Sequence, residues 1–415
     1  MKKIAVIGSG ISGLTAAHLL SQQHDVTLYE AEDRLGGHTA TVDVQIGDRQ
    51  HAIDTGFIVF NDWTYPNFNK LLERTGVAIQ ATEMSFSVQH QASGIEYNGN
   101  NLSTLFAQRA NLLSPKFYTF IGEILRFNKL TKQRLANGGG AMATTLGDFL
   151  QLYRFSEFFA VHYILPMVAA IWSSSIRDAR VFPLDLFLRF FNHHGLLNVI
   201  KRPQWYVIKN GSRSYIPGLV APVQQVRTGC PVLSIKRLQN GVRVVSVIDT
   251  VDYDEVVLAC HSDQALKMLT DCSYQEKRVL GALHYRDNDV VLHTDTRLLP
   301  ENRRAWASWN FWQGAGEDAA PAVTYNMNIL QGIDAEQTFC VTLNRSEAID
   351  PDKILGRYRY AHPVYDSGTL EAQQQRETIS GHNHTHFCGA YWYNGFHEDG
   401  VRSALDVCRH FGIQL

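Results

Sequence analysis

The stretch KIAVIGSGISG at residues 3–13 decides the fold of this chain. Its apolar run 3–7 predicts a buried parallel strand, and the glycine-rich turn that follows leads into an expected helix over 14–20. A second apolar strand is predicted at 26–29, and it ends at Glu30. Strand, glycine turn, helix, strand and acid in this order are typical of a dinucleotide-binding βαβ unit.

Each residue type in this unit has a physical reason. Gly8 permits the tight turn, Gly10 lets backbone N–H groups approach a pyrophosphate, and Gly13 lets helix and strand pack closely. The start of the helix offers unpaired N–H groups and partial positive charge to phosphates. Glu30 accepts hydrogen bonds from ribose hydroxyls and would repel a 2′-phosphate, which disfavours NADP. An ordinary glycine-rich connection would not need an acid there.

Bulk composition describes a globular protein with more than one domain. The chain has 415 residues, 45% of them hydrophobic and 19% charged, so we expect about two domains. The net charge of −2 gives no basic field for nucleic acid. Six cysteines are scattered without a CxxC pair, and the first strand begins at residue 3, which together predict a cytoplasmic protein.

One apolar stretch, residues 155–172, requires a comparison with membrane spans. It contains Glu157, His162 and Pro166 and is shorter than the roughly 20 apolar residues that a span requires. We therefore expect a buried or substrate-lining helix, with peripheral contact to a lipid surface as the alternative.

Shifts in residue pattern divide the chain into alternating segments. Nucleotide-binding patterns occupy 1–79, return at 211–269 and close the chain at 376–415. Helical periodicity and many aromatics mark 80–210 as a mostly helical part of a substrate domain, with a glycine turn at 138–140, and 270–375 reads as its strand-rich part. The predicted fold is α/β: a discontinuous Rossmann-type domain with an inserted α+β substrate domain.

Local patterns predict the connecting elements. They comprise a hairpin of 39–44 with 50–53, a helix capped by Thr64 and ended by Gly76, a hairpin of 231–238 with 242–248, strands at 256–260, 322–328, 339–343 and 385–387, and a C-terminal helix that opens at 398–401.

The second glycine pair separates two cofactor classes. A nicotinamide dehydrogenase usually needs one continuous pair of Rossmann halves, whereas Gly36-Gly37 and a late glycine turn suit FAD, which must be held at several chain positions.

These motifs resemble a known family. Gly8-x-Gly10-x-x-Gly13, Glu30 and RLGGHT at 34–39 are similar to the FAD-binding signature of flavin-containing amine oxidases, protoporphyrinogen oxidases and phytoene-type desaturases. The segments GFIV at 56–59 and GFHEDG at 395–400 resemble a bacterial branch of NAD/FAD-binding proteins. Genes of that branch often lie beside methyltransferases similar to cyclopropane fatty acid synthases, which implies a fatty-acyl-modifying partner.

The resemblance implies an amine-oxidase-like fold and a set of cofactor-binding residues. They are Gly8, Gly10, Ser12, Gly13, Glu30, Ala31, Arg34, Gly36, Gly37, His38, Thr39, Gly56, Phe57, Ile58, Val232, Ala259, Gly389, Asp399, Gly400 and Val401.

Three departures from the family pattern bear on this set. His38 replaces the usual arginine, so its pyrophosphate contact is expected to be weaker or pH-dependent, and Ala390 replaces an acid. No cysteine sits in the setting that attaches flavin covalently in monoamine oxidases, which implies non-covalent FAD.

Candidate catalytic groups are few. The N–H of Val401 would stabilise negative charge on a reduced flavin ring. Tyr391 and Trp392 would wall the substrate channel or pack in the core, and His397 would act as a base or make a structural hydrogen bond.

Other candidates carry weaker expectations. Trp172, Trp205 and Tyr206 are pocket-liner candidates for which core packing is favoured. His382, His384 and His386 share one face of a strand, but no acid or cysteine is expected near enough to complete a metal site, so we expect no metal.

The leading functional hypothesis is an FAD-dependent oxidoreductase that exchanges hydride with an apolar substrate, with an acyl lipid favoured because few charges mark the substrate domain. Two alternatives stay open: a flavin amine oxidase, and a non-catalytic flavin-binding partner of a lipid-modifying enzyme. The segment 34–39 disfavours an NAD-dependent dehydrogenase.

Overall fold

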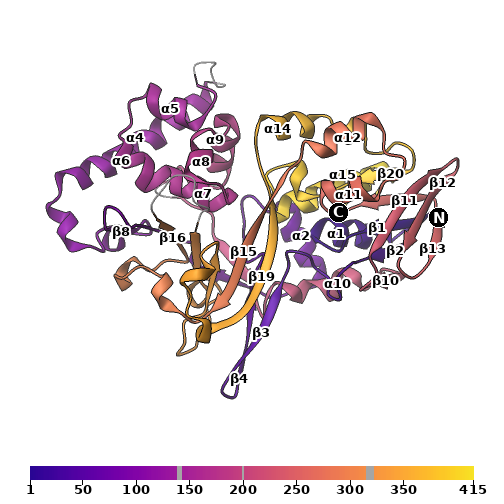
Figure 1. Cartoon of the computed structure of the whole chain (residues 1–415), viewed down its shortest axis with the longest axis horizontal. Helices are drawn as coiled ribbons and strands as arrows, with labels where there is room; N and C mark the ends of the chain where they lie inside the picture. Colours follow the sequence, from indigo (N-terminus) through magenta and orange to yellow (C-terminus); the bar gives the residue numbers. More distant parts are fainter. Residues whose placement is uncertain (138–142, 199–200, 315–321) are drawn as a thin grey trace.

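A five-stranded parallel sheet collects strands from distant parts of the chain. The computed structural model describes residues 1–137, 143–198, 201–314 and 322–415. The order of strands in this sheet is β10-β2-β1-β14-β20. Their bounds are β1 Lys3–Ile7, β2 Asp25–Tyr29, β10 Gln225–Arg227, β14 Glu255–Leu258 and β20 Thr385–Phe387. The sheet therefore draws on all three predicted nucleotide-binding segments, and both termini lie at its end of the molecule (Figure 1).

Alternating side chains of β1 serve two different layers. Ile4 and Val6 join a core with the helices on one face, and Ala5 and Ile7 join a core with an antiparallel sheet and two helices on the other. The first layer holds α1 Ile11–Leu20, α2 Pro66–Thr75, α10 Ile216–Val220 and α15 His397–His410. The second holds β11 Val232–Leu238, β12 Gly241–Ser246, β13 Thr250–Tyr253, α11 Ser262–Met268 and α12 Tyr274–Gly281.

A seven-stranded sheet forms the centre of the second half of the molecule. Its order is β19-β15-β18-β17-β16-β7-β8, and β16 pairs with β7 in parallel while the other pairs are antiparallel. Its bounds are β7 Phe86–His90, β8 Ile95–Asn98, β15 Tyr285–His293, β16 Trp309–Gln313, β17 Ala322–Asn326, β18 Cys340–Leu343 and β19 Ile354–Pro363. The segment predicted as mostly helical thus contributes two strands, because β7 completes its hydrogen bonds only against the distant β16.

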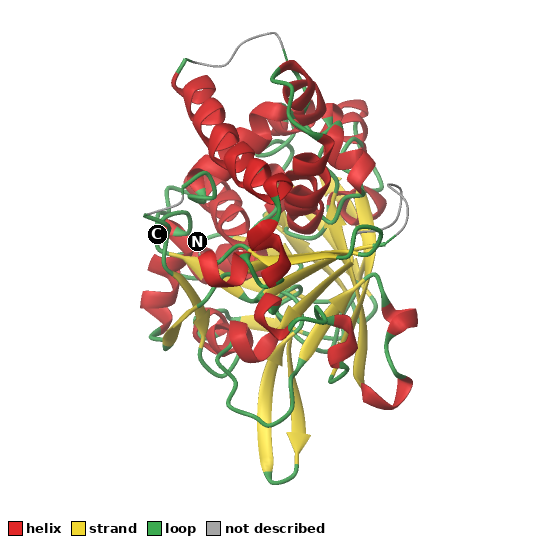
Figure 2. Cartoon of the chain, turned by 90° about the vertical axis from the view of Figure 1, so that its left-hand side faces the viewer, coloured by secondary structure: helices red, strands yellow, loops and turns green. Residues whose placement is uncertain are grey.

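Helices cover this sheet at the upper left of Figure 1 and at the top of Figure 2. They are α3 Leu102–Leu105, α4 Pro115–Ala136, α5 Leu146–Leu152, α6 Glu157–Phe159, α7 Leu165–Trp172, α8 Ile176–Arg180 and α9 Leu184–His193. The remaining helices are α13 Met327–Leu330 and α14 Ser367–Gln374. The glycine turn predicted at 138–140 lies outside the described residues.

The apolar stretch 155–172 is buried, as expected. It forms α6, a π-helical turn at Ala160–Ile164 and α7, with Phe159, Ile164 and Val168 fully buried. Pro166 lies directly after the π-helical turn, at the point where α7 takes over. Over the described residues, no helix combines the length and the apolar character that crossing a membrane requires.

Two hairpins match the expected positions, with one shift. β3 Thr41–Ile46 pairs with β4 Arg49–Asp54 in the hairpin that protrudes at the bottom of Figures 1 and 2. In the other hairpin Gly241 already pairs with Leu238, so the second strand begins one residue before the predicted 242 and the turn is Gln239–Asn240.

The predicted cap of α2 is wrong. Thr64 donates its hydroxyl to Asn61, and Tyr65 precedes the helix without capping it. The carboxylate of Glu398 instead accepts from the backbone N–H groups of Asn67 and Phe68, so α15 supplies the cap from the far end of the chain. Gly76 ends α2 in the left-handed conformation (φ 66°), as predicted. A small sheet of β5 Val59–Asn61, β9 Trp205–Ile208 and β6 Ile79–Thr82 lies nearby.

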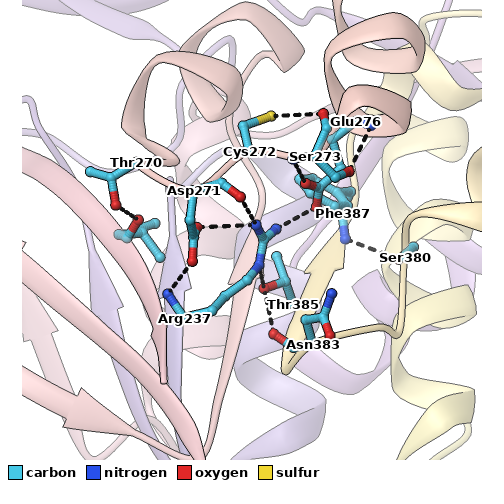
Figure 3. Close-up of polar contacts among 11 residues, drawn as sticks. Arg237, Thr270, Asp271, Cys272, Ser273, Glu276, Ser380, Asn383, Thr385 and Phe387 are labelled. Carbon is cyan, nitrogen blue, oxygen red and sulfur yellow. Dashed lines mark hydrogen bonds and ion pairs between the residues drawn. The ribbon is translucent and has the colours of Figure 1, made fainter. Parts of the chain in front are cut away.

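A buried arginine joins three elements on the far side of the five-stranded sheet (Figure 3). Arg237 on β11 pairs with Asp271 at 3.2 Å and with Glu276 on α12, and its Nε donates to the Thr385 hydroxyl on β20 at 3.1 Å. Only 9% of the Arg237 side chain and 7% of that of Glu276 are exposed, so this group acts as an internal cross-link.

Candidate functional site

The glycine turn after β1 leaves the start of α1 open. Gly8 has a φ of +101°, and a Cβ added at Gly13 would overlap the carbonyl oxygen of Gly8. Gly10 precedes α1 without a side-chain cap, and a Cβ built on it would have no neighbour within 4 Å. The first N–H groups of α1 therefore face unfilled space, which is the donor set of an anion site.

Glu30 sits beside this turn at the end of β2. One carboxylate oxygen accepts from the Ser9 N–H at 2.9 Å and the Ser9 hydroxyl at 2.5 Å, and the other accepts from the Glu32 N–H at 2.9 Å. A carboxylate has about four acceptor positions, so capacity remains for ligand hydroxyls. The N–H of Cys230 donates to the Glu30 carbonyl at 2.8 Å and brings the hairpin of Val232 to this edge, as expected.

The second glycine pair packs directly on the first turn. Gly36 (φ +116°) donates its N–H to the Ser9 carbonyl at 3.1 Å, and a Cβ on Gly37 would lie 3.2 Å from the Gly10 Cα. Arg34 donates to the carbonyl oxygens of Gly37 at 2.9 Å and Thr39 at 3.3 Å, so its exposed guanidinium supports this loop from the protein surface. Ala31 is exposed at the surface.

The loop continues against the segment that follows β4. Phe57 donates its N–H to the carbonyl of His38 at 2.7 Å, and a Cβ on Gly56 would overlap that same oxygen. Ile58 is buried beyond it. Gly10, Gly37 and Gly56 thus form a continuous run of close backbone contacts, as a ligand held along the main chain would require.

The start of α15 converges on the start of α1. A Cβ on Gly400 would lie 2.6 Å from Ile11 Cγ2 and 3.0 Å from Ser12 Oγ. Val401 is fully buried, and Gly389 donates its N–H to the Ser403 hydroxyl at 2.8 Å. On the other side Ala259 donates its N–H to the Ile7 carbonyl and packs against Gly8 and Gly13. Two helix N-termini at one place reinforce each other's positive potential.

His397 has a structural set of partners. Its ring stacks on Phe57 with centroids 3.5 Å apart, and its Nε2 lies 3.0 Å from the Thr39 hydroxyl and 3.2 Å from that of Tyr215. Burial, and secondly the nearby His38, lower the pKa of His397 well below its usual range, so the ring is neutral. These contacts account for His397 as a link between the glycine loop and α15.

Tyr391 and Trp392 lie in the core next to Gly389. They are 3% and 2% exposed and share a hydrophobic cluster with Leu258 and Phe387. No partner for the Tyr391 hydroxyl or the Trp392 indole N–H is found in the described part of the chain. Core packing accounts for the apolar parts of both rings, and their role as a wall of the substrate channel stays a prediction.

Sequence reasoning missed the neighbours of His38. The ring centroids of Tyr360, His362 and His261 lie 5.3, 5.6 and 6.1 Å from that of His38. Burial, then His362 and His261, lower the pKa of His38 to about 3. Its contact with a pyrophosphate would therefore be that of a neutral ring, with any pH dependence confined to acid. His261 follows β14 and His362 lies in β19, and neither position carries a local motif.

The three residues predicted as possible pocket liners, Trp172, Trp205 and Tyr206, have different neighbours in the structure. The ring centroids of Trp172 and Phe190 lie 4.7 Å apart. Phe190 in turn stacks on Phe396, the residue before α15, with centroids 4.9 Å apart. Trp205 and Tyr206 instead pack toward Tyr65 and Phe60 beside the helices of the five-stranded sheet. Trp172 reaches Phe396 through Phe190, and Trp205 reaches the same ring through His194, at centroid distances of 6.4 and 5.9 Å.

The alternating histidines lie close to an acid, Glu255, that is distant from them in the sequence. Glu255 lies 3.6 Å from His384 and 3.4 Å from His386, while His382 contacts the carbonyl of Glu377. Glu255 is also paired with Lys2 at 2.7 Å. Within the ranges that the structure describes, no set of three such side chains has the geometry to hold a metal ion.

Comparisons with known proteins agree with this geometry. A model of the family described as flavin containing amine oxidoreductase matches residues 11–320. Cyclohexylamine oxidase from Brevibacterium oxydans is similar over 99% of both chains, with 15% identity and a TM-score of 0.69. A fatty acid isomerase from P. acnes is similar over 99% of this chain and 98% of its own, with 16% identity and a TM-score of 0.70. A putrescine oxidase variant gives 14% identity, a TM-score of 0.71 and 99% coverage of both chains. At these identities the solved structures establish a shared fold.

Proposed function

Because this chain belongs to the flavin-containing amine oxidoreductase family, we propose that it holds FAD non-covalently and oxidises an apolar substrate, with an acyl lipid favoured. The family membership makes it a flavin-dependent oxidoreductase. The choice of FAD, its non-covalent attachment and the substrate are the parts that we propose. In the proposed reaction a substrate C–H bond breaks, its hydride reduces the flavin, and a proton leaves.

The donor set supports FAD. The open N–H groups of α1 and the nearby start of α15 suit a pyrophosphate, and Glu30 suits a ribose. Nε2 of His38 is buried without a partner in the described residues, as expected of an atom that faces a bound group.

The proposal gives each backbone segment one task. Residues 36–39 and 56–58 would line the cofactor with main-chain atoms. The N–H groups in the first turn of α15, which begins at His397, would stabilise negative charge in place of the N–H of Val401, because Val401 is the fifth residue of that helix. When bound, the flavin supplies a two-electron acceptor. The protein's own contribution is placement and exclusion of water.

The carboxylates near the start of α15 support an apolar substrate. Glu398 is occupied by the N–H groups of Asn67 and Phe68, and Asp399 accepts from the N–H of Phe396 at 3.0 Å. Asp54, fully buried, accepts from Ser212. These carboxylates are already hydrogen-bonded inside the protein, whereas the side chains of Trp172, Phe190 and Phe396, which pack on one another ahead of α15, are apolar. This arrangement is the observation that carries the proposal, and the likeness to a protein described as a fatty acid isomerase supports it.

Amine oxidation is the second candidate. It is favoured by the two amine oxidases of the same fold, and Tyr391 and Trp392 would have to supply the aromatic cage that a neutral amine needs. The third reading, a flavin carrier for a fatty-acyl-modifying methyltransferase in the cytoplasm, predicts bound flavin without turnover.

An anaerobic reduction assay separates the three. Purified protein is mixed without oxygen with fatty acyl lipids or with amines, and the flavin absorbance band is followed. Bleaching by acyl lipids alone supports the proposal, bleaching by amines alone replaces it with amine oxidation, and a band that no substrate bleaches favours the carrier. Flavin that stays with the protein after denaturation would contradict non-covalent binding.

A further inference from the structure

Large apolar side chains stand exposed at the end of the helical layer remote from the termini. They lie on α3, on the turn that joins it to α4, and along the outer face of α4, which is at the far left of Figure 1. We call this set the α3–α4 surface: Leu102, Leu112, Leu113, Tyr118 and Leu125, with exposures of 74, 44, 88, 52 and 53%.

The segment is well supported from beneath, so the exposure is built in. Asn101 forms a capping box at the start of α3, and Ser114 caps α4 ahead of Pro115. Phe117 and Phe120 are 2% and 1% exposed and belong to the main core cluster. The exposed leucines are therefore the outer side of a packed element, and the core already has its own side chains.

Charge distinguishes this surface from the rest of the protein. Residues 99–137 contain six Lys or Arg and one acid, Glu123, although the whole chain carries a net charge of −2. Glu123 is already bound by the Ser156 N–H at 2.7 Å and lies 3.7 Å from Arg126. Lys129 is exposed one turn beyond Leu125 on the same helix face. Apolar side chains thus project from a locally basic segment.

We propose that the α3–α4 surface docks on an anionic phospholipid surface. Exposed leucines and a tyrosine inside a basic segment match the two attractions that hold a protein at such an interface, apolar burial and charge complementarity. This segment differs from residues 155–172, for which lipid contact was the alternative to burial and whose apolar side chains pack in or against the core.

Docking here extends the proposed function without depending on it. Aromatic contacts lead from α4 inward, from Phe127 to Phe187 at 6.0 Å, then to Phe191 at 4.1 Å, and through Phe190 to Phe396 at 4.9 Å. The surface and the proposed substrate side thus belong to one continuous core, so an enzyme seated this way would take an acyl substrate from the layer on which it sits.

Vesicle co-sedimentation tests the proposal with the flavin-loaded full chain. The vesicles are phosphatidylcholine alone, or phosphatidylcholine with phosphatidylglycerol. We expect binding to the anionic vesicles that weakens as salt is raised. The double variant Leu112→Ser/Leu113→Ser should lose roughly tenfold or more in partitioning, and Lys129→Glu roughly tenfold.

A matched control comes from the other end of the molecule. Ile248 is 69% exposed near β12, so Ile248→Ser removes a comparable apolar side chain and should bind vesicles like the wild type. Flavin content and circular dichroism establish that each variant is folded.

Equal partitioning of wild type and the double variant, or equal binding to neutral and anionic vesicles, overturns the proposal. So does an absence of vesicle binding by the wild type, which would leave an acidic protein as the partner to seek. Co-sedimentation measures vesicle binding and the anaerobic assay measures turnover, so the two proposals can be rejected separately. A protein that oxidises soluble acyl substrates can still fail to bind vesicles, and a protein that binds vesicles can still fail to oxidise acyl lipids.

Discussion

Gly10 is the residue at which a small change should remove the cofactor and keep the fold. A Cβ there meets nothing within 4 Å, and its φ of −61° is open to any residue. Gly10→Val would place methyl groups in the space assigned to the pyrophosphate. We expect a colourless protein, with flavin occupancy reduced at least about tenfold and a melting temperature close to that of the wild-type apoprotein.

The control for Gly10→Val is Gly122→Val on α4. A Cβ at Gly122 also meets nothing within 4 Å, and the position is remote from the glycine turn. It should remain yellow. If the Gly10→Val protein keeps its full flavin content, the pyrophosphate does not bind at this position.

Asp399 should make stability depend on pH. Burial raises the pKa of Asp399 from 3.8 to about 7, although the backbone N–H groups of Phe396 and Asn394 favour its charged form. The folded protein therefore holds a proton that the unfolded chain releases, so this contribution is present near pH 4 and is lost as pH rises through 7.

The test is the melting temperature of Asp399→Asn against wild type. The amide is neutral at every pH and still accepts a hydrogen bond from the Phe396 N–H. The melting temperature of the variant relative to that of the wild type should therefore rise by roughly 4 °C between pH 5 and pH 8. Parallel melting curves across that range would contradict the assignment.

At this scale the sequence was informative where the backbone sets the requirement. Gly8 and Gly13 follow from a tight turn and a close helix–strand approach, and both are needed in the structure. The contacts of His38 with His261 and His362 could not be predicted, because they join side chains from three elements whose relative placement no local pattern encodes.

Among elements, the cross-link of Arg237 makes the clearest prediction. Arg237→Met leaves Glu276 buried and Asp271 without its partner, and it frees the hydroxyl of Thr385 (Figure 3). Breaking a buried pair costs roughly 3–5 kcal/mol, so the unfolding transition should move to clearly lower denaturant concentration.

Arg243→Met on the neighbouring strand is the comparison. Arg243 pairs with Asp252 at 2.8 Å, but about half of each side chain is exposed, 48% and 52%. Water and salt screen such a pair, so its loss should hardly change the denaturation midpoint. Equal shifts for the two variants would show that burial does not set the strength of the cross-link.

Element boundaries show where local reasoning stops. The strands β1 and β2 and the end of α2 at Gly76 follow from their own residues. The start of α2 does not, because Glu398 supplies its cap from more than three hundred residues away. The strands β7 and β8 form a local hairpin, which joins the large sheet only through the pairing of β7 with the distant β16.

For the whole molecule, the proposed cofactor should act as a stabiliser. The glycine turn, the loop at 36–39 and the start of α15 come from opposite ends of the chain, and a ligand that binds all three favours the folded state. FAD at about 100 times its dissociation constant should add about 2.7 kcal/mol to the free energy of unfolding.

A titration of apoprotein with FAD, followed by thermal denaturation, measures this effect. The melting temperature should keep rising with FAD concentration beyond saturation, and NAD at the same concentrations should leave it unchanged. A rise with NAD and none with FAD would overturn the cofactor assignment.

The order of strands in the five-stranded sheet has a consequence for synthesis on the ribosome. β14 pairs with β1 on one side and with β20 on the other, and β20 is Thr385–Phe387. Until those last residues leave the exit tunnel, a nascent chain carries an unpaired edge at β14 and an α1 without its companion helix. The sheet is therefore completed only after Thr385–Phe387 has emerged, and until then β14 offers its free edge to any other strand that can pair with it.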